Sequence, residues 1–332
     1  MVNNLILEST QLERSQRIAA RLLSFMPPLH KLPPKIFRPL FLIMDRIMGI
    51  KKEDMHSVVD YLIPTTTNEN GQVHKLKIRA YYPKPDDSTQ DSSKQKSMVY
   101  FHGGGCVIGS IETHDRFCRY LAKHSNTIII SVDYRLAPEH KFPVPIYDAI
   151  DAWNWINHHH KQLNLNPEHI GVGGDSAGGY LACLIGLTSL QEALPVKSNK
   201  APSFQFLLYP MLDLQGLTQS YKKFTKHLIL TKALMDYFRG HYLNSSNDHS
   251  QPLASPLQAD DISMSAKTYL LTLGHDPLRD DGIAYGERLK KQGIQTDHEH
   301  YDDCMHAFIS VTKLSQRARE ATQSVAAALA RM

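Results

Sequence analysis

The chain has 332 residues, 42% of them hydrophobic, and a formal net charge of +4 at pH 7. This composition is sufficient for a large buried core, and the lysines and arginines form no basic stripe, which argues against nucleic acid as a partner. The four cysteines are scattered and match no metal-binding or redox spacing, so we expect buried thiols and a cytoplasmic protein.

Residues 1–50 form a predicted helical segment that is separate from the rest of the chain. Two proline pairs, Pro27-Pro28 and Pro33-Pro34, divide it into short pieces. The start of the chain has neither a basic region nor a long apolar run, so we expect no secretory signal. The most apolar stretch, residues 37–50, is too short and too charged to cross a bilayer, and we expect no stable membrane insertion.

Strands and helices alternate in the middle and at the end of the chain. An edge strand is predicted at residues 73–81, followed by an exposed polar loop at residues 84–97. The later predicted strands are residues 98–101, 127–132, 169–173, 204–209, 268–273 and 296–301. The predicted helices are residues 115–124, 146–153, 180–185 and 284–291. Apolar strands that alternate with helices predict an α/β fold with a mostly parallel sheet covered on both faces.

One stretch interrupts this alternation. Residues 211–252 contain a predicted helix at residues 231–242 and no predicted strand. We interpret this stretch as a helical insertion above the sheet, and we expect it to build a cap together with residues 1–50. The alternative for residues 1–50 is a helical layer that covers the core. The core is then formed by residues 51–210 and 253–332.

The pentapeptide Gly174-Asp175-Ser176-Ala177-Gly178 fits Gly-x-Ser-x-Gly, a sharp strand-to-helix turn that exposes a serine hydroxyl above a sheet. A predicted strand precedes it and a predicted helix follows it, as this turn requires. Glycines suit such a turn because a Cβ would meet neighbouring backbone. We therefore interpret Ser176 as a nucleophile, and the alternative is a serine that caps an ordinary helix.

A serine nucleophile needs a base and an acidic residue that orients the base, and after this kind of turn the acid precedes the histidine. Asp276 follows a predicted strand directly, at the sheet edge where active-site residues are presented, and is the expected acid. Asp280 and Asp281 compete with it, but their place at the start of the next helix predicts a role as helix N-terminal charges.

His306 lies on a predicted loop after the last strand and is the expected base, because a loop histidine can reach the serine over the sheet edge. His298 and His300 fall within that strand and are expected to be sheet residues. A zinc pair there would lack a third ligand, and the adjacent histidines 158–160 cannot converge on one ion. No metal site is therefore expected.

A glycine-rich run, His102-Gly103-Gly104-Gly105, follows the predicted strand 98–101 directly. The developing negative charge of an acyl-transfer intermediate needs fixed N–H donors, and residues without side chains let the backbone come close to it. We expect the N–H groups of Gly103, Gly104 and Ala177 to be these donors. His102 is expected to shape the loop through local hydrogen bonds.

Five motifs occur in one order along the chain. They are His102-Gly103-Gly104-Gly105, the residues 133–139, Gly174-Asp175-Ser176-Ala177-Gly178-Gly179, the residues 276–280, and His306-Ala307-Phe308. In this order they resemble the hormone-sensitive-lipase family of α/β-hydrolase esterases, in its branch with Asp before the serine. The resemblance covers about residues 60–330. The sequence departs from the family at Ala307, Tyr180 and His275, which leaves the proposed triad intact.

The resemblance implies an α/β-hydrolase fold with a helical cap and the catalytic triad Ser176, Asp276 and His306, supported by His102, Gly105 and Asp175. It also implies hydrolysis of short- to medium-chain acyl esters through an acyl-enzyme, without metal or organic cofactor. The expected partner is a small-molecule ester. Whether the chain forms a homodimer is left open by the sequence. Amide or lactone hydrolysis is the nearest alternative reaction. A ligand-binding receptor on the same scaffold is the alternative class, but such a receptor typically lacks a member of the triad.

Overall fold

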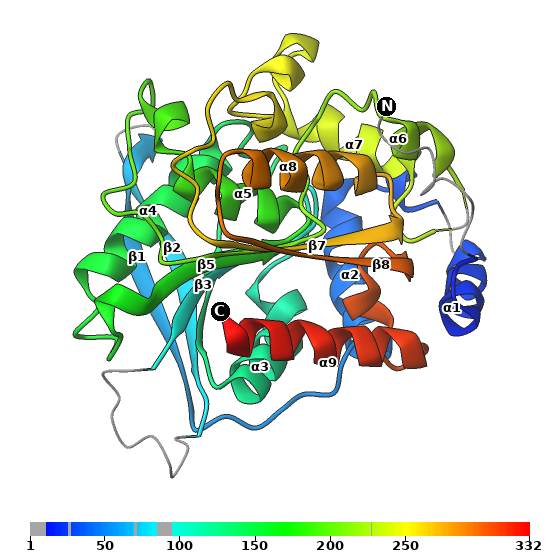
Figure 1. Ribbon diagram of the computed structural model, residues 1–332, viewed down its shortest axis with the longest axis horizontal. Coiled ribbons are helices and arrows are strands. Elements are labelled where there is room, and N and C mark those ends of the chain that lie inside the picture. The colour runs from blue at the N-terminus through cyan, green and yellow to red at the C-terminus, as the bar shows by residue number, and fades with distance from the viewer. Residues whose placement is uncertain (1–10, 26–27, 70–71, 85–94, 227) are drawn as a thin grey trace.

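A central sheet organises the molecule, whose computed structural model describes residues 11–25, 28–69, 72–84, 95–226 and 228–332 (Figure 1). Within these residues the sheet has eight strands in the order β1-β2-β4-β3-β5-β6-β7-β8. Strand β2 pairs antiparallel with β1 and β4, and all other pairs are parallel. The strands are β1 (Ser57–Glu69), β2 (Gln72–Tyr82), β3 (Ser97–Phe101), β4 (Ile128–Asp133), β5 (Ile170–Asp175), β6 (Gln205–Leu208), β7 (Thr268–His275) and β8 (Thr296–Met305).

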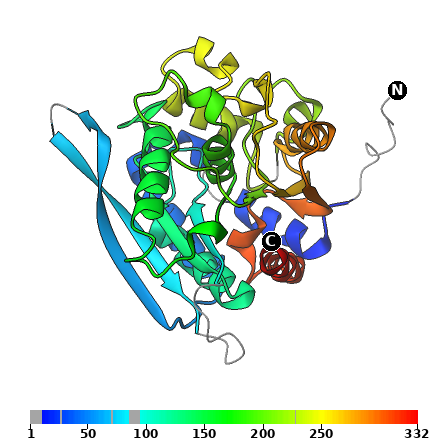
Figure 2. The same cartoon turned by 60° about the vertical axis from the view of Figure 1, so that its left-hand side comes forward.

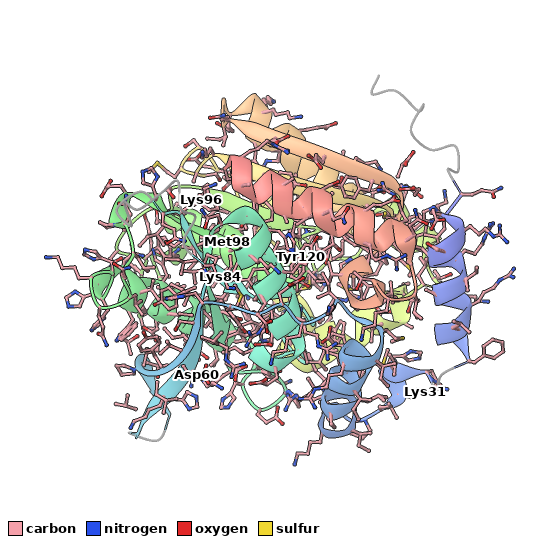
Figure 3. All side chains as sticks on the ribbon, turned by 90° about the horizontal axis from the view of Figure 1, so that it is seen from below. Lys31, Asp60, Lys84, Lys96, Met98 and Tyr120 are labelled. Carbon is pink, nitrogen blue, oxygen red and sulfur yellow. The ribbon has the colours of Figure 1, made fainter. Side chains whose placement is uncertain are left out.

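Helices cover both faces of this sheet (Figure 1). Helices α4 (Val144–His158), α5 (Ala177–Gly186) and α8 (Arg279–Lys291) lie on one face. Helices α3 (Ile111–Ser125) and α9 (Gln316–Arg331) run side by side across the other face (Figure 3). The predicted α/β fold with a mostly parallel sheet is therefore confirmed.

The central strands are apolar throughout because both of their faces are buried. In β3, Val99 and Phe101 join the core under α4 and α5, whereas Met98 and Tyr100 join the core under α3 and α9. Successive side chains of a strand point to opposite faces, so one strand supplies both cores. This explains why these segments show no alternation of apolar and polar residues in the sequence.

The strand prediction at residues 73–81 was wrong in one respect. This segment is β2, which lies second in the sheet, and the edge position belongs to β1, which was not predicted. Strand β1 includes Asp60, Pro64 and a run of threonines, so it lacks a regular apolar pattern. Figure 2 shows the β1–β2 hairpin along one side of the molecule. Most of the predicted loop at residues 84–97, namely residues 85–94, lies outside the described residues.

The two predicted cap segments contain four further α-helices, at least within the described part of the chain: α1 (Arg14–Ser24), α2 (Pro34–Met48), α6 (Gln219–Lys223) and α7 (Lys232–Tyr242). Between α1 and α2, a short 3-10 helix (Leu29–Lys31) lies against α7. The hydroxyl of Tyr237 donates to the carbonyl oxygen of Leu32 at 2.9 Å, and the rings of Phe37 and Tyr237 lie 6.2 Å apart. Segments about 200 residues apart in sequence thus meet above the sheet.

Helix α1 takes a different place from α2. It lies against α9, where the hydroxyls of Ser15 and Ser315 are 2.8 Å apart. The side chain of Gln16 is buried and accepts a hydrogen bond from the N–H of Met305 at 2.8 Å. The N-terminal segment therefore contacts the end of β8 as well as α7. Within the described residues, no helix is long and apolar enough to cross a membrane.

Strand register brings distant sequence motifs to one edge of the sheet. Phe101 pairs with Gly174, so the loop after β3 lies beside the turn after β5. His275 pairs with Met305, so the residues that follow β7 and β8 also become neighbours. These four connections meet at the carboxyl ends of parallel strands, which is where α/β sheets place their ligands.

Candidate active site

Ser176 lies at the apex of the turn between β5 and α5, with φ 53° and ψ −117°. This left-handed conformation is uncommon for a residue with a side chain, and the crowded turn around it maintains it. A Cβ on Gly178 would lie 1.8 Å from the carbonyl oxygen of Phe101, and a Cβ on Gly174 would lie 2.4 Å from the same atom. The serine side chain makes no hydrogen bond to the start of α5, which excludes the helix-cap interpretation.

The structure brings Ser176, His306 and Asp276 together. The Ser176 hydroxyl lies 3.0 Å from Nε2 of His306, and Nδ1 of His306 lies 2.6 Å from Oδ2 of Asp276. The other Asp276 oxygen, Oδ1, accepts the N–H of Leu278 at 2.8 Å. Since a carboxylate only accepts hydrogen bonds, it keeps the proton of the imidazole on Nδ1, and Nε2 is free to accept the serine proton.

The competing acidic and histidine residues have other partners. Asp280 accepts the N–H of Ser220 at 2.7 Å, and Asp280 and Asp281 both lie in the first turn of α8. The ring nitrogens of His298 and His300 lie 2.9 Å and 2.8 Å from the hydroxyl of Thr272 on β7. In the described part of the chain, no group of three or more histidine, cysteine or carboxylate side chains could hold a metal ion.

The His306 side chain is held by contacts that the sequence did not reveal. The ring of Tyr209 meets it edge-on at 4.8 Å, and Gln16 binds the backbone of the preceding residue, Met305. The residue that follows, Ala307, has φ 55° and ψ 33°, a left-handed conformation that glycine adopts at lower cost. This conformation gives a physical reason for the glycine that the related family commonly has there.

The structure of the glycine-rich loop contradicts one of the expected oxyanion donors, the N–H of Gly103. Gly104 and Gly105 have φ 118° and 62°, which permit the tight turn that follows β3. The N–H of Gly103 donates to Oδ1 of Asp175 at 2.9 Å, so it is not available to a substrate oxygen. Among the described residues, the N–H groups of Gly104, Gly105 and Ala177 have no hydrogen-bond partner. The prediction for Gly103 was therefore wrong, because its partner comes from a distant strand.

His102 shapes the loop from beneath. Its ring stacks on Tyr134 at 4.3 Å, the Tyr134 hydroxyl donates to the His102 carbonyl at 2.6 Å, and its Nδ1 lies 2.8 Å from the carbonyl oxygen of Gly103. Complete burial is the main reason that the pKa of His102 falls to about 3, and the nearby His114 lowers it further. The ring is therefore neutral at any pH at which the protein would be assayed.

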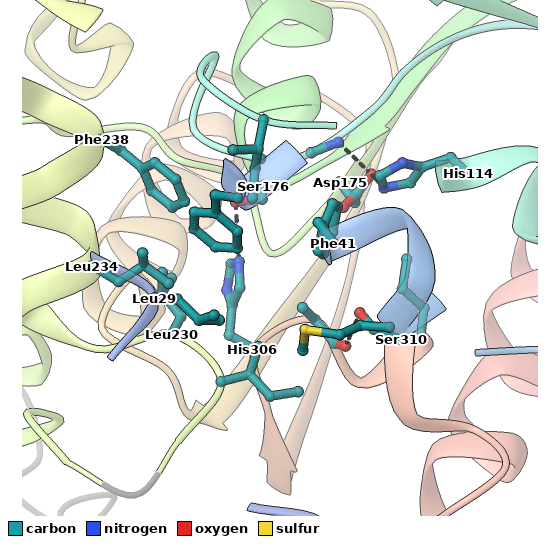
Figure 4. A pocket seen from close by; sticks show the side chains of 18 residues that line it. Leu29, Phe41, His114, Asp175, Ser176, Leu230, Leu234, Phe238, His306 and Ser310 are labelled. Atoms are coloured by element: carbon teal, nitrogen blue, oxygen red, sulfur yellow. Dashed lines mark hydrogen bonds and ion pairs between the residues drawn. The ribbon is translucent and has the colours of Figure 1, made fainter. Parts of the chain in front are cut away.

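A largely apolar pocket opens above Ser176 and His306 and contains about 620 Å³ of empty space, including its open mouth (Figure 4). Both predicted cap segments line it. The first contributes Leu29, Phe37, Phe41 and Met44, and the second contributes Ile229, Leu230, Leu234 and Phe238. His114 also lines the pocket, and the sequence patterns did not indicate it. Such a site can bind a small apolar molecule with its reactive bond at the serine.

Comparisons with known proteins show which family the chain belongs to. The sequence profile of the α/β-hydrolase fold matches residues 98–310. Among curated relatives, the carboxylic ester hydrolase LipN of Mycobacterium tuberculosis is 32% identical over 274 residues, 82% of this chain and 69% of that protein. Ethyl acetate hydrolase of Pseudomonas putida is 29% identical over 319 residues, 96% of this chain and 95% of that protein.

Solved structures show the same similarity over nearly the whole chain. An ester hydrolase from the metagenome of Lake Arreo, solved with a bipyridine phosphonate derivative, matches with a TM-score of 0.87 and 32% identity, covering 97% of this chain and 99% of that one. A hyperthermophilic esterase from Pyrobaculum calidifontis matches with a TM-score of 0.85 and 33% identity, with the same coverage of both chains. The chain therefore belongs to the α/β-hydrolase fold family, in its hormone-sensitive-lipase group of carboxylic-ester hydrolases.

Proposed function

We propose that Ser176, His306 and Asp276 are the catalytic triad through which this chain hydrolyses carboxylic esters. The observation that carries the proposal is the pair of short contacts, 3.0 Å from the serine hydroxyl to Nε2 and 2.6 Å from Nδ1 to the aspartate. All three side chains are buried, which strengthens these interactions by excluding water.

The reaction then runs through an acyl-enzyme. Ser176 attacks the ester carbonyl while His306 takes its proton, and His306 returns that proton to the leaving alcohol. Water then attacks the acyl-serine with His306 as base and releases the acid. Asp276 orients the imidazole and stabilises its cation. The unpaired N–H groups of Gly104, Gly105 and Ala177 are the donors we assign to the oxyanion, in place of the Gly103 assignment.

Covalent labelling of the intact protein tests the nucleophile. A fluorophosphonate probe is expected to phosphonylate Ser176, since its phosphorus mimics the tetrahedral intermediate, and the labelled peptide is identified by mass spectrometry. Heat-denatured protein is the control, because labelling needs the assembled triad. Labelling of a different serine, or of none, would contradict the assignment. It would also favour the alternative of a binding protein on a hydrolase scaffold.

We further propose short- to medium-chain acyl esters as substrates, with the cap segments setting the accepted size. The apolar residues above Ser176 and the printed name of the ethyl acetate hydrolase relative support this choice. A series of p-nitrophenyl esters from two to sixteen acyl carbons is expected to give the highest kcat/KM at or below about eight carbons, since apolar side chains of both cap segments bound the pocket above Ser176. A maximum at the longest chains would contradict this choice. A matched anilide and a lactone test the alternative reactions.

The four cysteines, Cys106, Cys118, Cys183 and Cys304, are free and buried. Free thiols are typical of reducing compartments, which supports our proposal of a cytoplasmic location. Burial also raises the pKa of the Cys304 thiol to about 12, which argues against it as a nucleophile beside His306.

A further inference from the structure

A second buried histidine lies in the wall of the pocket, on a different element from the proposed triad. His114 belongs to the first turn of α3 and lies beside Asp175, the residue before Ser176 (Figure 4). Its Nε2 is 3.3 Å from Oδ1 of Asp175, and 6% of its side-chain surface is exposed. Its ring also stacks against that of His102, with centroids 5.5 Å apart.

Both ring nitrogens of His114 face oxygen atoms that can accept a hydrogen bond. Nδ1 lies 2.9 Å from the hydroxyl oxygen of Thr113, and that hydroxyl also lies 2.9 Å from the carbonyl oxygen of Ser110, to which it can donate its hydrogen. When the hydroxyl hydrogen points to Ser110, the hydroxyl oxygen accepts from the ring. Nε2 faces a carboxylate, which only accepts. With the hydroxyl in that orientation, both contacts are satisfied when the ring carries a proton on each nitrogen.

Asp175 connects this histidine to the glycine-rich loop. Its Oδ1 also accepts the Tyr100 hydroxyl at 2.6 Å and the N–H of Gly103 at 2.9 Å. The bond to Gly103 fixes the peptide just before Gly104 and Gly105, whose N–H groups we assign to the oxyanion. A small displacement of such donors is enough to slow an acyl-transfer reaction severely.

We propose that His114 is a positioning residue whose doubly protonated ring holds Asp175, and through Asp175 the oxyanion-binding loop, in its working geometry. The role of His114 rests on the proposed role of Ser176, because it acts on the same reaction. His114 does not itself take part in bond making, since its nitrogens are occupied by Thr113 and Asp175.

The charges around the ring favour this protonation state. Burial lowers the pKa of His114, but Asp175 and, more weakly, Asp45 of α2 raise it above its ordinary value overall. Burial likewise raises the pKa of Asp175, but His114 and the Tyr100 hydroxyl outweigh it, and the pKa is lowered.

The other titratable groups around His114 affect its protonation less than Asp175 does. Asp45 has a pKa raised by burial to about 6, against the lowering effect of His114, Arg116 and Lys313, so it is ionised at neutral pH. Asp115 opposes the ionisation of Asp45, and His102 is neutral. The doubly protonated ring of His114 is present at low pH and is lost as the pH rises through its raised pKa. The wild-type kcat is therefore expected to fall on the alkaline side.

Two substitutions test the proposal with purified protein. His114→Leu is expected to lower kcat by about 10- to 100-fold, the range for a weakened oxyanion donor, with KM changed less than about threefold. His114→Gln is expected to restore most of kcat, since its amide N–H can reach Asp175. It is also expected to lose the alkaline decline, since the amide does not titrate. His124→Leu, near the exposed end of the same helix, is the matched control and is expected to behave as wild type.

The opposite results would overturn the proposal. They are an unchanged kcat in His114→Leu, an effect on KM alone, or an alkaline decline that persists in His114→Gln. If the leucine variant does not fold, NMR of the wild-type ring decides, with His114 assigned from the glutamine variant. Two protonated nitrogens at pH 7 support the proposal and a neutral ring refutes it. Ser176 labelling separates the two proposals, because a labelled, active His114→Leu protein would refute only the role of His114.

Discussion

Replacing Ser176 with alanine is expected to lower kcat for an activated ester on the order of 10⁶-fold while the protein stays folded. The hydroxyl is the only group in the pocket that lies within hydrogen-bond distance of His306 Nε2, at least among the described residues. Alanine keeps the same Cβ, so the left-handed backbone of the turn meets no new contact. Steady-state hydrolysis of p-nitrophenyl acetate measures the activity, and circular dichroism with thermal unfolding measures the fold.

The control for this substitution is Ser324→Ala, which removes a hydroxyl from the exposed side of α9 and should keep full activity. A Ser176→Ala protein that unfolds as the wild type does yet retains more than about a thousandth of its kcat would refute the nucleophile assignment. Without a triad member, only substrate binding and the oxyanion donors contribute to catalysis. These contributions do not account for a kcat above that threshold.

Replacing Asp276 with asparagine is expected to lower kcat by about 10⁴-fold with little change in the fold. Oδ1 of Asp276 accepts the N–H of Leu278, so the asparagine carbonyl oxygen is expected to stay there and its NH₂ group to face His306 Nδ1. Nδ1 must then be the acceptor, the imidazole proton moves to Nε2, and the serine loses its base.

The pair Asp276→Asn and Asp261→Asn makes this test specific. Asp261 is exposed, and its substitution should leave kcat unchanged. Kinetics over pH 6–9 and a thermal unfolding midpoint complete the comparison. A loss of less than about tenfold in Asp276→Asn would show that another acidic residue orients His306, with Asp280 the nearest candidate in sequence.

Much of this molecule could be predicted from its sequence where the physical signal is local. The turn around Ser176 needs glycines at fixed positions, and a continuous apolar run such as β4 has few alternatives to a buried strand. Asp276 and His306 were predicted from chain order and from their place just after predicted strands, and the structure brings their side chains together. Each of these predictions depends on a few neighbouring residues.

The failures concern features that only the assembled fold creates. Gly103 is adjacent in sequence to Gly104, yet its N–H is hydrogen-bonded to Asp175. No local sequence pattern reveals a partner 72 residues away. Strand β1 gains its structure from pairing with β2 rather than from its own composition. Helix α9 was not predicted at all, and His114 resembled any histidine near a helix start.

The hydrogen bond from the N–H of Met305 to Gln16 links helix α1 to the backbone beside His306. The family profile spans residues 98–310, which begins after α1 and ends before α9. A protein trimmed to that stretch would lack Gln16, and the N–H of Met305, beside the proposed base His306, would lose its partner. The family profile therefore leaves out an N-terminal helix that supports the backbone beside the proposed base.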